Sequence, residues 1–278
     1  MISDAPPDEI ESLHSEIRRL RRSLSELTPP LSALLKLRGF KIYKQEPSDD
    51  LLLPRQKFID SFYGMLRKYS FRLFIRDVIK HQECFSIQQV TRYSTASVTG
   101  EYAEYLNEVG LIEPVTGGFR LVPGPIKSFG ETLEWYVAEI FRREFAAEAI
   151  WGIRFKRPGI GGDYDLIAKV DGSILYMEVK SSPPKQIYQS EISAFFDRMN
   201  DLAPEIGIFF VDTELRMKDK IVPMFYEEYG KRDGETREIL RMEKELFQVQ
   251  NRVFIINAKD SIDANIEKVL IRYFRGSL

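Results

Sequence analysis

Short apolar runs alternate with amphipathic stretches through the second half of the chain. Apolar residues that recur at helical spacing predict helices, whereas short continuous apolar runs predict buried strands. We expect helices over 130–146, 187–202, 227–250 and 262–274, and strands over 149–155, 163–169, 173–180, 206–211 and 252–257. The dipeptide Asp171-Gly172 joins the second and third strands and favours a β-hairpin. This order predicts an α/β (α+β) architecture, a mixed sheet flanked by helices.

The first half of the chain has a different pattern. Between residues 71 and 122, three helical patterns precede two strand-like pieces that a glycine turn joins. This order resembles a winged helix-turn-helix domain, whose usual role is DNA binding. The third helix would be the recognition helix in the major groove of DNA. Residues 95–109, however, contain three glutamates and neither Lys nor Arg, the residues that normally contact bases and phosphates. Two alternatives therefore stay open for this module: contacts to a protein partner, or contacts to DNA through Arg92 and Arg120.

A heptad pattern begins the chain. Apolar residues at spacings of three and four form a seam that consists of Ile10, Leu13, Ile17, Leu20, Leu24 and Leu27. The pattern favours equally an amphipathic helix packed on its own domain and a coiled coil that joins two copies in a homodimer. Pro29-Pro30 ends the helix, and residues 45–55 predict a polar linker.

The composition of the chain mainly excludes some classes of protein. The chain has 278 residues, a hydrophobic fraction of 44%, a charged fraction of 29% and a net charge of −2, which are ordinary for a soluble globular protein. One cysteine excludes an intrachain disulfide framework and is compatible with a reducing cytoplasm. The first residues lack a signal-peptide pattern, and no apolar run approaches the length of a membrane span. We therefore expect a cytoplasmic protein that makes no membrane contact.

The hairpin over 163–180 carries the candidate chemistry. Asp165 lies at the start of its first strand, and Glu178 and Lys180 lie at the end of its second, where alternation puts them on one face. Solvated charges on an outer face would be the simpler interpretation. The apolar residues around these charges favour a buried sheet instead, in which unpaired charges are costly. Carboxylates suit Mg²⁺ or Mn²⁺, and Lys180 could orient a water or hold a phosphate.

Asp165 and the tripeptide Glu178-Val179-Lys180, separated by twelve residues, resemble the motif of the PD-(D/E)xK nuclease superfamily. That superfamily includes restriction endonucleases and archaeal Holliday-junction resolvases. The sequences GGDYD and EVKSS are most similar to the resolvase and Mrr-like branches. The resemblance covers residues 128–275 and implies a restriction-endonuclease-like fold. We therefore expect a heptad helix and linker over 1–50, a winged-helix-like domain over 51–127 and a nuclease-like domain over 128–278.

The resemblance also implies roles for individual residues. Asp165 and Glu178 would bind Mg²⁺ or Mn²⁺, and Lys180 would position the attacking water. Glu134 matches the glutamate on the first core helix that joins or supports the metal site. Two residues are accessory candidates. Asp163 could bind a second metal or cap the turn, and Gln189 is the polar residue that such sites often take from the next helix.

Tyr164 occupies the position at which the family has proline. Basic residues flank the hairpin, and the candidates for nucleic-acid binding are Arg154, Lys156, Arg157 and Lys185. Because the net charge is −2, basic residues must cluster on one face to neutralise phosphates.

The favoured hypothesis is a metal-dependent endonuclease acting on duplex or branched DNA. A homodimer would allow such an enzyme to cut both strands. The alternative is a non-catalytic DNA- or protein-binding factor built from a winged helix and an inactive nuclease fold, since fold does not fix function.

Overall fold

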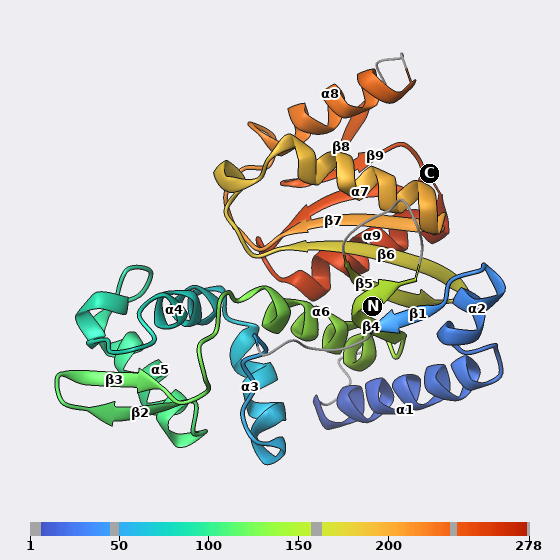
Figure 1. Cartoon of the computed structure of the whole chain (residues 1–278). Helices are drawn as coiled ribbons and strands as arrows, with labels where there is room; N and C mark the ends of the chain where they lie inside the picture. The colour runs from blue at the N-terminus through green and yellow to red at the C-terminus, as the bar shows by residue number, and fades with distance from the viewer. Residues whose placement is uncertain (1–6, 45–49, 157–162, 234–237, 277–278) are drawn as a thin grey trace.

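The computed structural model describes residues 7–44, 50–156, 163–233 and 238–276 (Figure 1). In these parts of the chain, eight strands form one mixed sheet through the centre of the molecule. In order across the sheet they are β1 (Ile42–Lys44), β4 (Glu148–Phe155), β5 (Tyr164–Val170), β6 (Ser173–Lys180), β7 (Ile206–Val211), β10 (Val253–Asn257), β9 (Leu246–Val249) and β8 (Ile239–Glu243). The neighbours β6, β7 and β10 are parallel, and the other pairs are antiparallel.

Helices cover both faces of this sheet, which gives the mixed α/β architecture that the sequence predicts. On one face, α6 (Gly130–Glu144) and α9 (Ile262–Arg275) pack on residues such as Leu166 and Ala168. On the other, α7 (Gln189–Leu202) and α8 (Ile221–Asp233) pack on residues such as Ile167 and Tyr176. The alternation of Leu166, Ile167 and Ala168 between the two cores is the period of two expected of a strand.

The predicted helix over 227–250 is confirmed over 227–233, within α8 (Ile221–Asp233), and is wrong over 239–249. Helix α8 ends at Asp233, and β8 and β9 then form an antiparallel hairpin that turns at Lys244, where φ is 42°. The many Glu, Arg and Lys residues in this stretch favour a helix locally. All four residues of β9 are buried, however, and β9 pairs with β10. Burial and strand pairing therefore outweigh the local preference.

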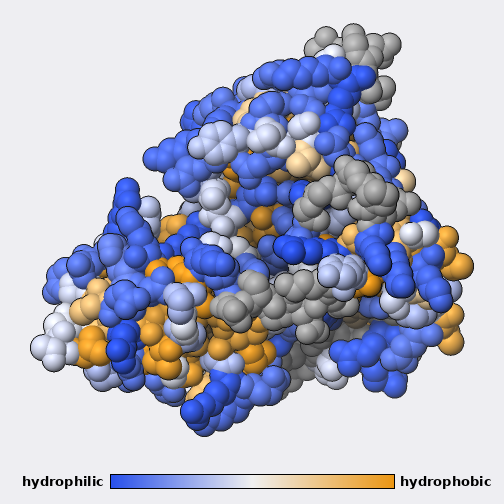
Figure 2. All heavy atoms as spheres, viewed as in Figure 1, coloured by the Kyte–Doolittle hydropathy of each residue, from blue (hydrophilic) through white to orange (hydrophobic). Residues whose placement is uncertain are grey.

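The module over residues 51–127 contains most of the elements expected of it. Its helices are η1 (Gln56–Phe58), α3 (Ile59–Leu66), α4 (Tyr69–Lys80), η2 (Ile87–Val90) and α5 (Ala96–Glu108), and its hairpin is β2 (Ile112–Val115) with β3 (Gly118–Leu121). The second expected helix is only the short 3₁₀ turn η2. Figure 2 shows apolar residues gathered over the part of the molecule that this module occupies. Its role as a winged helix stays a prediction.

This module shares a hydrophobic core with the sheet. The rings of Phe62 and Trp135 lie 6.3 Å apart between centroids, and Tyr63 lies on Tyr136 at 5.4 Å. The polar linker expected over residues 45–55 is wrong for its described part, since Leu52 is buried and its N–H donates to Thr132 Oγ1 at 3.0 Å. Residues 45–49 lie outside the described residues.

The first residues do more than form a heptad helix and a linker. After α1 (Pro7–Glu26), α2 (Leu31–Leu37) packs in the sheet core, and the Leu31 N–H donates to Glu148 Oε2 at 2.8 Å. Strand β1 then extends the sheet by pairing with β4. The seam residues whose side chains are described are all exposed, namely Leu13, Ile17 and Leu20 in α1 and Leu27 directly after it. Among the described helices, none is long and apolar enough to cross a membrane.

Candidate active site

Asp165 and Glu178 lie opposite each other where β5 and β6 stop pairing. The last pair of the ladder at this end is Leu166 with Met177, so the same register places Asp165 opposite Glu178. Here the Asp165 side chain takes the place of a main-chain acceptor, because the Val179 N–H donates to Asp165 Oδ2 at 2.8 Å. The hairpin predicted from Asp171-Gly172 therefore brings the two carboxylates together at the open end of the strands.

Two cations hold the Glu178 carboxylate. Lys180 Nζ lies 2.8 Å from Oε1, and Arg198 Nη1 lies 2.9 Å from Oε2. The Tyr176 hydroxyl also donates to this carboxylate. The Glu178 side chain is only 2% exposed, so these partners supply the compensation that a buried charge requires.

Arg198 is a site residue that sequence reasoning missed. It lies on α7, three residues after the buried Phe195, and its guanidinium reaches the sheet beside Glu178. A single arginine among the apolar residues of one helix face was the available signal. Gln189, chosen from the same helix, lies at its first turn, where its Nε2 donates to the Met224 carbonyl oxygen of α8 at 3.0 Å.

Lys180 keeps its charge in this setting. Burial alone would lower the pKa of Lys180, but the carboxylates of Glu178 and Asp165 raise it above its usual range. Its ammonium also lies 3.4 Å from Glu191 Oε1, on the first turn of α7. The ammonium is thus held between the end of β6 and a helix, with part of its surface open to a ligand.

Glu134 brings a further acidic group to the same place from α6. Burial, and then the charge of Asp165, raise the pKa of Glu134 well above its usual range, with smaller contributions from Glu131, Glu178 and Asp163. Burial and Glu178 likewise raise the pKa of Asp165 to about 7. Protons, or a bound cation, would relieve this repulsion.

The donor set can be compared with the needs of a divalent metal. Among the described residues, no three Asp, Glu, His or Cys side chains are already grouped so that they could hold an ion. Mg²⁺ can bind through one or two carboxylates with water and substrate phosphate as its other ligands. Glu134 and Asp165 fit that chemistry, and Glu178 could join them only by loosening its contacts with Arg198 and Lys180.

The remaining predicted residues have other contacts or are exposed, where the structure describes them. Asp163 is paired with Arg154, whose Nη2 donates to Oδ2 at 2.8 Å, so these two candidates neutralise each other. Lys156 and Lys185 are exposed, and the Lys185 carbonyl oxygen accepts from Lys220 Nζ at 2.9 Å. Arg157 lies outside the described residues.

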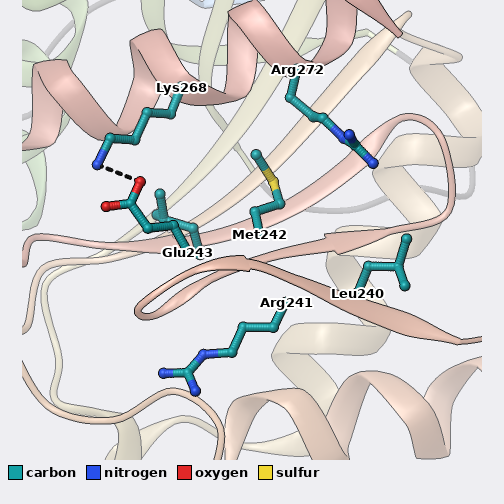
Figure 3. Close-up of a pocket in the computed structure, with 7 residues that line it drawn as sticks. Leu240, Arg241, Met242, Glu243, Lys268 and Arg272 are labelled. Carbon is teal, nitrogen blue, oxygen red and sulfur yellow. Dashed lines mark ion pairs between the residues drawn. The ribbon is translucent and has the colours of Figure 1, made fainter. Parts of the chain in front are cut away.

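A hollow between β8 and α9, away from these residues in the sequence, has mostly paired charges (Figure 3). Lys268 Nζ lies 2.9 Å from Glu243 Oε2, and Arg272 Nε donates to Gln248 Oε1 at 2.8 Å. Arg241 donates to the Lys244 carbonyl oxygen. The contacts of Lys268 and Arg272 hold β8 and β9 against α9, and we assign the hollow a structural role.

Comparisons with known proteins show the fold of this chain. No protein-family model and no curated protein matches the sequence. Among solved structures, it is similar to Can2 from Sulfobacillus thermosulfidooxidans in complex with cyclic tetra-adenylate, with 14% identity and a TM-score of 0.51 over 89% of this chain and 61% of Can2. Protein VC1899 from Vibrio cholerae matches with 14% identity and a TM-score of 0.47 over 87% of this chain and 60% of that one.

This chain therefore spans less than two thirds of the length of either protein. At 14% identity, the likeness to Can2 establishes a shared fold, a large mixed sheet flanked by helices. The chemistry has to be argued from the side chains.

Proposed function

We propose that this protein is a nuclease that hydrolyses phosphodiester bonds in duplex or branched DNA with the help of Mg²⁺ or Mn²⁺. The meeting of Glu134, Asp165 and Glu178 beside the charged Lys180 supports this function. Burial and mutual repulsion raise the pKa values of Glu134 and Asp165, and acids perturbed in this way beside an ammonium are typical of sites that bind a cation and a phosphate.

Each side chain would have a separate task. Asp165 and Glu134 would hold the metal, with Glu178 as a further ligand once its contacts with Arg198 and Lys180 loosen, and a metal held there would activate water and stabilise charge on the phosphate. The Lys180 ammonium would donate to the attacking water or to a phosphate oxygen. Arg198 would position Glu178, and through it Lys180.

A direct assay tests this proposal. Purified protein incubated with supercoiled, linear, branched and single-stranded DNA should cut at least one of them in Mg²⁺ or Mn²⁺. Chelation of the metal by EDTA should stop cutting, and addition of excess metal should restore it. Cutting that continues unchanged in EDTA would contradict the role of the metal.

One observation favours the alternative, a non-catalytic DNA- or protein-binding factor. Glu178 is already neutralised by Arg198 and Lys180, as expected of a site that needs no metal. The same assay distinguishes the two functions. Protein that shifts DNA in a gel, yet cuts none of the substrates with either metal, would establish the binding factor.

We also infer a homodimer in which α1 pairs with α1 of a second copy. Leu13 and Leu20 are 54% and 50% exposed, although heptad positions normally lie in an interface.

The double variant Leu13→Glu with Leu20→Glu should therefore convert a dimer into a monomer with the 32.4 kDa mass of one chain, measured by light scattering. Ser15→Glu with Ser23→Glu adds the same charge to exposed positions off the seam and should stay dimeric. Equal masses for the two variants would refute the pairing of α1.

A further inference from the structure

A cleft of about 590 Å³ lies beside the candidate active site. Its walls come from α4, from the segment 125–129 ahead of α6, and from Ser181, which directly follows Lys180. The side chains that matter here are Arg76, Lys80, Lys127 and Phe129. The cleft therefore joins the module over residues 51–127 to the end of β6.

The cleft is lined by positive charge. Arg76, Lys80 and Lys127 contribute cations, and no Asp or Glu is among the described residues that line it. Lys80 and Lys127 are exposed, so their ammonium groups can contact a ligand. Two acids outside the lining interact with these cations: Asp50 Oδ2 is 4.0 Å from Lys127 Nζ, and the charges of Lys80 and Arg76 act on Asp77.

Arg76 is the second of two cations paired with one buried carboxylate. Asp212, directly after β7, is buried and already accepts three hydrogen bonds from Arg72, with Arg72 Nη2 at 2.8 Å from Oδ1. Arg76 Nη2 donates to the other oxygen of the same carboxylate, so two guanidinium groups share one negative charge. The Nε atom of Arg76 is buried and has no hydrogen-bond partner among the described residues. The Arg76 side chain is 19% exposed and lines the cleft, so it adds positive charge for a ligand with anionic oxygens.

The walls of the cleft are fixed to the candidate active site. The Gln82 side chain accepts from the Ile126 N–H at 2.8 Å and donates to the Ile126 carbonyl oxygen at 3.1 Å, which holds the segment 125–129 against α4. The Arg76 guanidinium lies 5.5 Å from the centre of the Phe129 ring. On the other side, the Asp212 N–H donates to the Lys180 carbonyl oxygen at 2.8 Å. These hydrogen bonds therefore fix the cations of the cleft in position relative to the candidate catalytic residues.

We infer that this cleft binds the phosphodiester backbone of a nucleic-acid strand and leads it to Lys180. The inference rests on the proposed function, because it names how the substrate of that site is held. Successive anionic phosphates match a row of cations, whereas the acidic face of α5 offers no such match. Lys80 and Lys127 would contact phosphates without reading bases.

Binding measured without cutting tests this inference. A labelled single-stranded 20-nucleotide DNA is titrated with the full chain in EDTA at several salt concentrations, and fluorescence anisotropy gives the affinity. Each phosphate contact to a single strand contributes about −0.7 to the slope of log K against log[salt]. The double variant Lys80→Gln with Lys127→Gln should bind more weakly and reduce the steepness of that slope by about 1.4.

A matched control removes the same charge elsewhere. Lys36→Gln with Lys231→Gln changes exposed lysines on α2 and α8, which lie away from α4 in Figure 1, and should keep the wild-type slope. Equal slopes for the two double variants would overturn the inference. So would displacement of the DNA by inorganic phosphate at the same total phosphate concentration, because that result would indicate a site for single phosphates. An RNA strand of the same length should bind through the same lysines.

The outcomes separate this inference from the proposed function. If the protein cuts DNA but both double variants bind it equally well, the nuclease function is supported and the role of the cleft is refuted. If the protein cuts no DNA, yet the Lys80 and Lys127 variant shows the smaller slope, the role of the cleft is supported and the nuclease function is refuted.

Discussion

Replacing Asp165 by asparagine should reduce metal-dependent DNA cleavage by roughly 10²–10³-fold, the cost typical of removing one preorganised charge-stabilising group. Asparagine has nearly the same shape, and its Oδ1 can still accept from the Val179 N–H, so the end of the hairpin should keep its geometry. The negative charge that would bind the metal is lost. The measurement is the initial rate of cutting at saturating Mg²⁺, with thermal unfolding of the variant as a check on folding.

Asp171→Asn provides a matched control for this substitution. It makes the same chemical change in the same hairpin but at the turn, at the far end of both strands. Asp171 has a φ of 48°, a left-handed conformation that asparagine adopts readily. This variant should therefore cut at the wild-type rate. Full activity in Asp165→Asn would exclude the carboxylate from the reaction, whatever the behaviour of the other residues.

The local parts of this site could be predicted from the sequence because they depend on neighbours along the chain. The Asp171-Gly172 turn fixes the register of β5 and β6, and that register alone brings Asp165 opposite Glu178. Glu134 could be placed only through the resemblance to a known family. Its approach to Asp165 depends on how α6 packs across the sheet.

The parts that could not be predicted depend on long-range packing. Arg198 reaches Glu178 because one face of α7 packs on the sheet, and helical periodicity does not say which sheet residue each side chain meets. Gln189 lies on the same helix but is directed to α8. The charged stretch over 238–249 forms strands only because β10 is available as a partner. The contacts of these side chains and strands are set by how the whole core packs.

The ion cluster of Arg72, Arg76 and Asp212 is the clearest case of such packing. Arg72 and Asp212 are 140 positions apart in the sequence, and neither stands in a motif. Both side chains are almost fully buried, and Arg72 Nη1 also donates to the Leu66 carbonyl oxygen at 2.6 Å. The cluster thus links α4 to the end of β7, next to Lys180. Its loss should loosen the contact between the two parts of the molecule.

Replacing Arg72 by methionine should lower the free energy of unfolding by about 3–5 kcal/mol, because it leaves the Asp212 carboxylate buried with only Arg76 as a partner. Arg76→Met should cost less, since Arg72 alone can pair with both oxygens of Asp212. Urea unfolding followed by circular dichroism measures both variants. Arg72→Met combined with Asp212→Asn should be more stable than Arg72→Met alone, because the unpaired buried charge is gone. If the second substitution instead destabilises the protein further, the cost of Arg72→Met comes from lost packing, and the ion pair is not what joins α4 to the sheet.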